Sequence, residues 1–174
     1  MNHVDEYEAR LRALGEVVTT HAHCEALVYT AFMDYSAIDA DRLRIIQEHG
    51  RVKVADMPKI IKAFIEHFPS DDAEADQRVQ DALKEFDRLT QQRNKFVHWQ
   101  WGVGVAGVPS ISDITKQRVG GDIRSESFDL EELHTLANRL QAIIGVLAVN
   151  LPSTRGVIPK HIREAFSAAS TAAK

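Results

Sequence analysis

Residues 79–98 read VQDALKEFDRLTQQRNKFVH, and their pattern predicts an amphipathic helix. Side chains spaced by three and four residues share one face of a helix. The face formed in this way carries Val79, Leu83, Phe86, Thr90, Arg93 and Val97. The pattern calls for apolar side chains at all of these positions, yet Thr90 and Arg93 are polar. The segment therefore indicates a helical fold and singles out a polar stretch near the end of this helix.

The rest of the chain shows helical spacing in five further segments. They cover about residues 4–33, 36–50, 58–68, 129–151 and 159–166. Between the fourth and fifth helices, glycine and valine alternate after Trp101 and Pro109 follows, which predicts a small β-hairpin over about 101–119. The sequence thus predicts an all-α fold, an up-and-down bundle of five to six helices with a β-hairpin insertion. One domain is expected over residues 1–166, followed by a frayed tail over 167–174.

The composition is that of an ordinary globular protein, with 44% hydrophobic and 26% charged residues among 174. The single cysteine, Cys24, excludes an intrachain disulfide and suits a reducing compartment. The N-terminus is polar and acidic, unlike a signal peptide, and the longest apolar run, residues 142–149, is too short to cross a bilayer. We therefore expect a soluble cytoplasmic protein that has no membrane partner. Because the net charge is −4, any contact with RNA requires a local basic patch.

Residues 93–98, RNKFVH, contain an arginine and a histidine, two groups that together are sufficient in principle for RNA cleavage without a metal. The guanidinium of arginine is a permanently charged fork that can hold two phosphate oxygens, and histidine can accept and return a proton near neutral pH. His98 would deprotonate the ribose 2′-hydroxyl, and Arg93 would stabilise the negative charge that develops on the phosphate. The hydroxyl would attack its own phosphate to leave a 2′,3′-cyclic phosphate, so DNA would not react. Arg93 and His98 lie about 140° apart on an ideal helix, and two copies of the helix across a two-fold axis would bring the groups together.

Residues 93–98 resemble the signature of the HEPN superfamily, in which an arginine and a histidine are separated by four to six residues and a polar residue often follows the arginine. HEPN domains are helical bundles that carry this motif on a late helix. Many members are metal-independent endoribonucleases of toxin–antitoxin, phage-defence or RNA-processing systems, and they usually place the motif at a dimer interface. The resemblance implies that Arg93 and His98 are catalytic, that Asn94 assists them and that the protein forms a homodimer through this helix. It also implies an RNA substrate, no cofactor and, for a toxin, a cognate protein inhibitor.

Two residues beside the motif, Lys95 and Trp99, are candidate substrate-binding residues. Trp99 is able to stack on an unpaired base, and Lys95 would contribute to a basic rim beside the helix. A structural alternative remains open for both. Tryptophans at a junction between a helix and a hairpin often anchor the hairpin on the bundle, and Trp101 shares that position. Lys95 would then be one of several solvated surface charges.

Arg93 and His98 also have a structural alternative. Arg93 would extend from the helix to an acidic residue on a neighbouring helix. His98 would interact with the negative end of the helix dipole at the C-terminus of its own helix.

No set of residues in the sequence predicts a metal site. His21 and Glu25 share a helix face, but His23 does not, and two ligands do not make a zinc site. Glu131 and His134 form one Glu-x-x-His pattern, whereas a di-iron bundle requires two such patterns and further carboxylates. A metalloenzyme in a helical bundle is therefore disfavoured, and we expect no cofactor.

Two functions from different classes remain. The first is a metal-independent endoribonuclease of the HEPN type, in a toxin, defence or RNA-processing system. The second is a non-catalytic helical interaction module, or an antitoxin-like partner-binding protein, in which the Arg93–His98 helix holds the dimer together.

Overall fold

The computed structural model describes residues 3–103, 109–114 and 123–172. The helices are α1 (His3–Ser36), α2 (Ala40–Gly50), the 3-10 turn η1 (Val54–Asp56), α3 (Met57–His67), α4 (Ala73–His98), α5 (Leu130–Asn150), α6 (Pro152–Arg155) and α7 (Lys160–Ala172). The strands are β1 (Gln100–Val103), β2 (Pro109–Asp113) and β3 (Arg124–Ser127). This confirms the predicted all-α bundle with a β insertion between the fourth and fifth helices. Within the described ranges, the single-turn helix α6 after Leu151 is the additional helix that the sequence did not predict.

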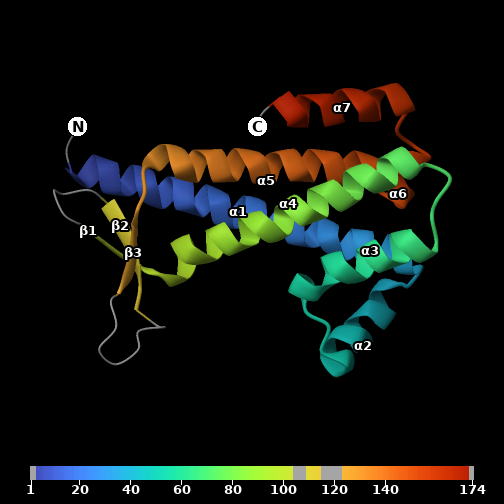
Figure 1. Cartoon of the computed structure of the whole chain (residues 1–174), viewed down its shortest axis with the longest axis horizontal. Coiled ribbons are helices and arrows are strands. Elements are labelled where there is room, and N and C mark those ends of the chain that lie inside the picture. The colour runs from blue at the N-terminus through green and yellow to red at the C-terminus, as the bar shows by residue number, and fades with distance from the viewer. Residues whose placement is uncertain (1–2, 104–108, 115–122, 173–174) are drawn as a thin grey trace.

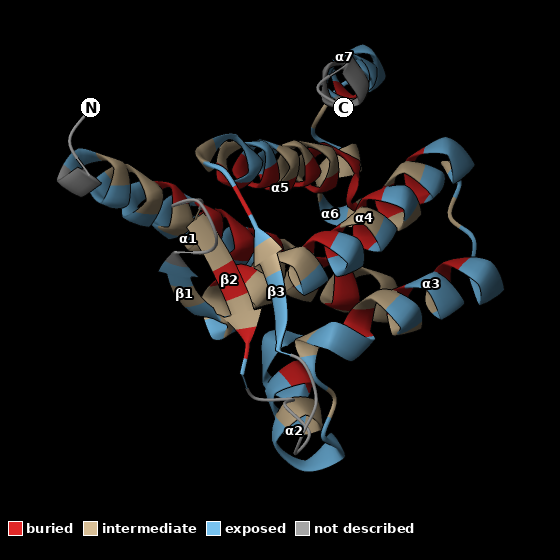
Figure 2. Ribbon diagram, turned by 60° about the vertical axis from the view of Figure 1, so that its left-hand side comes forward, coloured by how far each residue is buried: buried red, intermediate tan, exposed pale blue. Residues whose placement is uncertain are grey.

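Three long helices, α1, α4 and α5, form the centre of the molecule (Figure 1). Helices α1 and α5 lie side by side and run in the same direction, whereas α4 runs in the opposite direction (Figure 1). Buried residues gather on the faces where these helices meet, as Figure 2 shows, and they include Val17, Leu89 and Leu140. Cys24 belongs to this core: its Sγ donates to the carbonyl oxygen of Leu140 at 3.3 Å, and burial raises its pKa to about 12. Removal of this apolar surface from water is the main favourable contribution to folding.

The remaining helices pack around this centre. The buried side chains Met57, Ile61 and Ile65 of α3 face the core from the side of α1 and α4. Helix α7 lies on the outer side of α5 (Figure 1). None of the helices in the described part of the chain has the combination of length and apolar character that crossing a membrane demands.

The sheet between α4 and α5 is antiparallel and has the strand order β1-β2-β3. Strands β1 and β2 pair with Trp101 opposite Ile111, so the hairpin predicted over about 101–119 is present where it is described; residues 104–108 and 115–119 lie outside the described residues. The third strand, β3, was not predicted. It reads RSES and has no alternation of apolar residues, because it lies at the edge of the sheet and its side chains are mostly exposed.

Helix α7 extends from Lys160 to Ala172 and therefore includes most of the segment 167–174, for which a frayed tail was expected. Alanine has the highest helix propensity, and the last turns of α7 are rich in it. The helix is attached to the bundle by Arg163, whose Nη1 donates to Oδ2 of Asp72 at 2.7 Å.

A buried carboxylate, that of Asp76 in the first turn of α4, connects the ends of three helices. Its oxygens accept hydrogen bonds from the Tyr35 hydroxyl at 2.7 Å, the Ser70 hydroxyl at 2.8 Å and the Arg155 guanidinium at 2.5 Å. Burial opposes the charge of Asp76, but the hydrogen bonds from Arg155, Tyr35 and Ser70 outweigh burial and lower the pKa of the carboxyl. Arg155 also donates to the carbonyl oxygen of Asn150 at 2.5 Å. The end of α1, the start of α4 and the end of α5 are thereby fixed to one another.

Replacing Asp76 by alanine should lower the free energy of unfolding by about 3 kcal/mol, because Arg155 would then be an uncompensated buried charge. For a chain of this size that loss corresponds to a fall in melting temperature of roughly 6–12 °C. Thermal and urea denaturation of the two proteins would measure it. The control is Asp41→Ala, which removes an exposed ion pair with Arg44 and should change stability little. Equal stabilities of Asp76→Ala and Asp41→Ala would contradict the role given to the buried carboxylate.

Candidate functional site

Two hydrogen bonds fix the position of α4 along α1. At one end of the interface the Tyr35 hydroxyl donates to Asp76, and near the other end His21 Nε2 and Thr90 Oγ1 lie 2.9 Å apart. Tyr35 and His21 are 14 residues apart on α1, and Asp76 and Thr90 are also 14 residues apart on α4. Each interval spans about 21 Å at a rise of about 1.5 Å per residue. Because the intervals match and the helices are antiparallel, both bonds form at once, and Arg93 follows Thr90 by one turn on α4.

His21 is the buried member of this contact, with 2% of its surface exposed. Its ring packs on Phe86 with 5.0 Å between centroids, and Nδ1 has no hydrogen-bond partner among the described residues. The nearest carboxylate oxygen to Nδ1, that of Glu25, lies 3.9 Å away. Burial and, to a smaller extent, the positive charge of Arg93 lower the pKa of His21 to about 4. His21 is therefore neutral at physiological pH.

Arg93 is half-buried and, in the described part of the chain, has no carboxylate partner. Its Nη1 donates to Oδ1 of Asn94 at 3.0 Å, and its buried Nε makes no hydrogen bond to any described residue. The other buried or half-buried arginines of the described ranges each form an ion pair: Arg10 with Glu6, Arg78 with Glu74, Arg139 with Glu85, Arg155 with Asp76 and Arg163 with Asp72. The alternative in which Arg93 reaches an acidic residue on a neighbouring helix is therefore not what the structure shows. Its charge is not neutralised by any described side chain.

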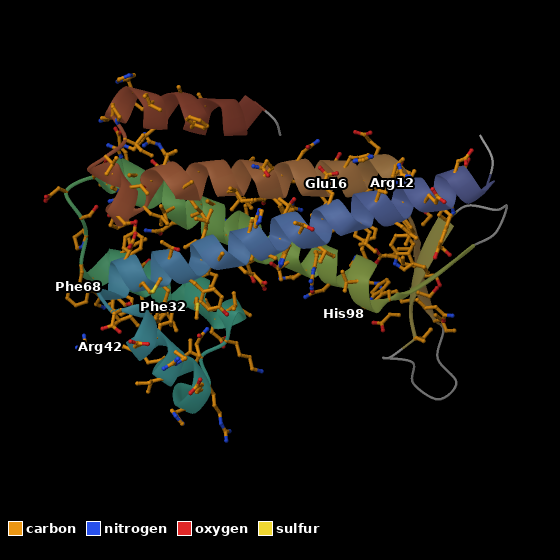
Figure 3. All side chains as sticks on the ribbon, turned by 180° about the vertical axis from the view of Figure 1, so that it is seen from behind. Arg12, Glu16, Phe32, Arg42, Phe68 and His98 are labelled. Carbon is orange, nitrogen blue, oxygen red and sulfur yellow. The ribbon has the colours of Figure 1, made fainter. Side chains whose placement is uncertain are left out.

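The structure brings Asn94 into contact with Arg93 and places His98 one turn beyond Asn94. Asn94 and His98 are separated by four residues, so they share a face of α4. The His98 side chain is exposed, and it makes no hydrogen bond or ion pair with any residue that the structure describes. It lies near the C-terminal end of α4, beside the sheet (Figure 3). Arg93 and His98 do not contact each other within one chain.

The end of α4 is fixed by the aromatic residues that follow it. Trp99 has an extended backbone, with ψ at 150°, and its N–H donates to the carbonyl oxygen of Lys95 at 3.0 Å. The Trp101 indole donates to the carbonyl oxygen of Phe96 at 2.7 Å, and its ring meets Phe128 with 4.9 Å between centroids. These contacts turn the chain into β1 directly after His98. Trp101 thus anchors the sheet on the bundle.

The two predicted substrate-binding residues, Lys95 and Trp99, belong to a polar cluster between α4 and β3. Lys95 Nζ lies 2.7 Å from Oε2 of Glu126, and this hydrogen bond is the largest of the effects that hold the pKa of Glu126 below its usual value. The ring of Trp99 has Lys95 Nζ at 5.4 Å and the Arg124 guanidinium carbon at 5.6 Å from its centroid. RNA would have to compete with Glu126 for Lys95, so the role of both residues in binding stays a prediction.

Sequence reasoning did not place His21 or Thr90 in the site. The polar position of Thr90 on the apolar stripe was the available signal, but the sequence does not show which side chain of another helix faces it. His21 was considered only as a metal ligand, and no group of three or more metal-ligating side chains occurs within residues 3–103, 109–114 and 123–172.

The lowered pKa of His21 predicts a specific dependence of stability on pH. The unfolded chain protonates this histidine below about pH 6.5, whereas the folded chain keeps it neutral down to about pH 4. The contribution of His21 to stability is therefore complete above about pH 6.5 and falls by roughly 3 kcal/mol as the pH decreases to about 4. Urea denaturation of wild type and His21→Gln from about pH 7 to about pH 4.5 would measure this loss, since glutamine is able to bond to Thr90 but does not titrate. Free energies of unfolding of wild type and His21→Gln that change in parallel over this range would contradict the prediction. The control is His49→Gln, which replaces an exposed histidine at the end of α2.

No family model, curated protein or solved structure matches this chain in comparisons with known proteins. Membership of the HEPN superfamily stays a prediction that rests on Arg93, Asn94, His98 and the helical character of the chain.

Proposed function

We propose that the protein is a metal-independent endoribonuclease of the HEPN type. The observation that supports this proposal most is the charge of Arg93, which no described carboxylate neutralises. The Arg93 guanidinium donates to Asn94, and the exposed His98 lies one turn beyond Asn94 on α4. A guanidinium without an acidic partner attracts an anion, and a phosphodiester suits its planar fork. Asn94 occupies one side of the guanidinium through Nη1, which orients the remaining N–H groups.

In the proposed reaction, His98 accepts the proton of a ribose 2′-hydroxyl, and the hydroxyl oxygen forms a bond to the adjacent phosphorus. The bond from phosphorus to the 5′-oxygen of the next nucleotide breaks, and that oxygen takes up a proton from the protonated histidine or from water. Arg93 stabilises the charge that develops on the nonbridging oxygens. The products are a 2′,3′-cyclic phosphate and a free 5′-hydroxyl. The RNA is required because DNA has no 2′-hydroxyl.

The separation of Arg93 and His98 favours a site that is completed by a second copy of the chain. Five residues of an α-helix correspond to a rise of about 7.5 Å and a rotation of about 140°. Two α4 helices that meet at their C-terminal ends around a two-fold axis would place the arginine of one chain and the histidine of the other on the same phosphate. A homodimer through the Arg93–His98 helix is therefore part of the proposal, as are a cytoplasmic location and, for a toxin, a cognate protein inhibitor.

A partner-binding module is the second candidate function. It is favoured by the exposed side chains of Tyr7 and Leu11, which are 55% and 46% accessible and lie one turn apart on α1. Under this alternative the chain would bind a protein through α1 and would cut no RNA under any condition. The partner-binding alternative gives no reason why Arg93 has no carboxylate partner among the described residues, whereas the nuclease proposal does. For that reason we place the nuclease first.

Cleavage of a mixed single-stranded RNA in excess EDTA tests the proposal. Wild type should cut the RNA and leave 2′,3′-cyclic phosphates, whereas His98→Ala should cut it at least about 100-fold more slowly, because proton transfer by a positioned side chain is worth that much or more. Arg93→Lys should retain part of the activity, since lysine keeps the charge but loses the two-oxygen geometry. His49→Ala is the control for loss of an exposed histidine far from α4. If His98→Ala cleaved as fast as wild type, or if neither protein cut any RNA, the nuclease proposal would be wrong.

A further inference from the structure

A groove between α3 and α4 leads toward the candidate site. Its volume is about 350 Å³, with one wall formed by η1 and α3 and the other by α4 from Gln77 to Asp87. A smaller depression of about 60 Å³ shares Ala55, Pro58 and Asp87 with it and continues to Thr90, the residue that bonds to His21. Together the two follow α4 from Gln77 to Thr90, a distance of about 20 Å along the helix.

The α4 wall of this groove and the candidate catalytic groups share one helix face. Gln80, Lys84 and Asp87 line the groove, and Asn94 and His98 follow them on α4 at spacings of 4, 3, 7 and 4 residues. Steps of three, four and seven residues each bring the chain back to nearly the same side of an α-helix. All five side chains therefore lie on one helix face. A chain that lies in the groove and continues along α4 would reach Asn94 and then His98.

The lining of the groove contains three lysines and two carboxylates, those of Asp81 and Asp87, whereas the protein as a whole has a net charge of −4. The depression that continues the groove toward Thr90 adds a third carboxylate, that of Glu25. The three lysines are Lys59, Lys62 and Lys84. Lys62 lies 3.6 Å from Glu66, whereas Lys59 and Lys84 have no carboxylate partner among the described residues. The carboxylate of Asp81 accepts a hydrogen bond from the Gln77 amide at 3.1 Å. Lys59 on one wall and Lys84 on the other are thus available to an anionic ligand that lies between them.

We infer that the α3–α4 groove binds the phosphate backbone of single-stranded RNA and directs the strand toward Asn94 and His98. The inference rests on the proposed nuclease function and names its substrate-binding track. A groove of about 350 Å³ accommodates part of one strand. Lysine binds phosphate as a point charge, without the fixed geometry of arginine, which suits a track that holds the backbone independently of base sequence. Polar side chains such as Gln80 would add hydrogen bonds to phosphate and sugar.

Salt-dependent binding of an uncleavable RNA tests the inference. A fluorescent 2′-O-methyl RNA of twelve nucleotides would be titrated with the full chain, and the binding constant would be measured at several salt concentrations. Substitution of both lysines, Lys59→Ala with Lys84→Ala, should weaken binding about tenfold at low salt. It should also reduce the slope of log K against log salt by about 1.4, since each lost phosphate contact on a single strand contributes about 0.7. In cleavage assays the same double variant should raise KM more than it lowers kcat.

Matched variants separate a binding role from other effects. The double variant Lys59→Arg with Lys84→Arg keeps both charges and should retain the wild-type slope. The double variant Arg44→Ala with Lys160→Ala removes two exposed cations outside the groove and should also retain it. Circular dichroism would show whether each variant is folded, which is expected because both groove lysines are exposed.

The outcomes distinguish failure of the groove inference from failure of the nuclease proposal. If the RNA is cut but Lys59→Ala with Lys84→Ala binds and cleaves as wild type does, the inference about the groove is wrong and the nuclease stands. If the slope changes as expected but His98→Ala cleaves like wild type, the track stands and the catalytic role of His98 is wrong. Binding of the twelve-nucleotide RNA no tighter than a mononucleotide would overturn the inference, because the lysines would then form a site for a single anion.

Discussion

The buried carboxylate of Asp76 determines how α4 lies along α1. It accepts hydrogen bonds from Tyr35 at the end of α1 and from Arg155 of α6, so the start of α4 is held at one level of the bundle. Because α4 is a rigid helix, fixing its first turn also fixes the level of its later residues relative to α1. Four turns later the contact between His21 and Thr90 occurs at the level that the equal spacing on the two helices requires. The place of Arg93, and so of the candidate site, follows from an interaction at the opposite end of the interface.

The two ends of this interface differ in how charge is compensated. At the Asp76 end, burial is matched by ion pairing and by hydrogen-bond donors from three residues, and the arrangement is typical of a structural network. At the Arg93 end, a half-buried guanidinium has an asparagine and a neutral histidine as its neighbours, and its Nε has no hydrogen-bond partner in the described part of the chain. An unsatisfied buried donor costs about 1–3 kcal/mol, which the surrounding structure has to offset. Such a cost is common at functional sites, where a charge is kept for a ligand.

Most of the fold could be predicted from the sequence because amphipathic helices produce a local pattern, in which apolar residues recur every three or four positions. The apolar stripe of α4, the proline and aspartate residues at helix starts and the glycine-rich hairpin are all local signals. Strand β3 was missed because RSES at a sheet edge has no apolar alternation, and because the residues that pair in β2 and β3 are at least 11 positions apart in the sequence. Thr90 and Arg93 were recognised as unusual, but the facing His21 is 69 residues from Thr90. No short-range pattern encodes such a contact. That no carboxylate among the described residues pairs with Arg93 is likewise visible only once the helices are packed.

The most direct test of the account is whether an RNA phosphate contacts the Arg93 guanidinium. Nitrogen-15 NMR would follow the guanidinium signals during titration with a 2′-O-methyl dinucleotide, which cannot be cleaved, and Arg93→Lys would identify the signal of Arg93. The account predicts a saturable shift of the Arg93 signal while that of Arg155, which is held by Asp76, stays unchanged. Binding of the dinucleotide without any shift at Arg93 would contradict it.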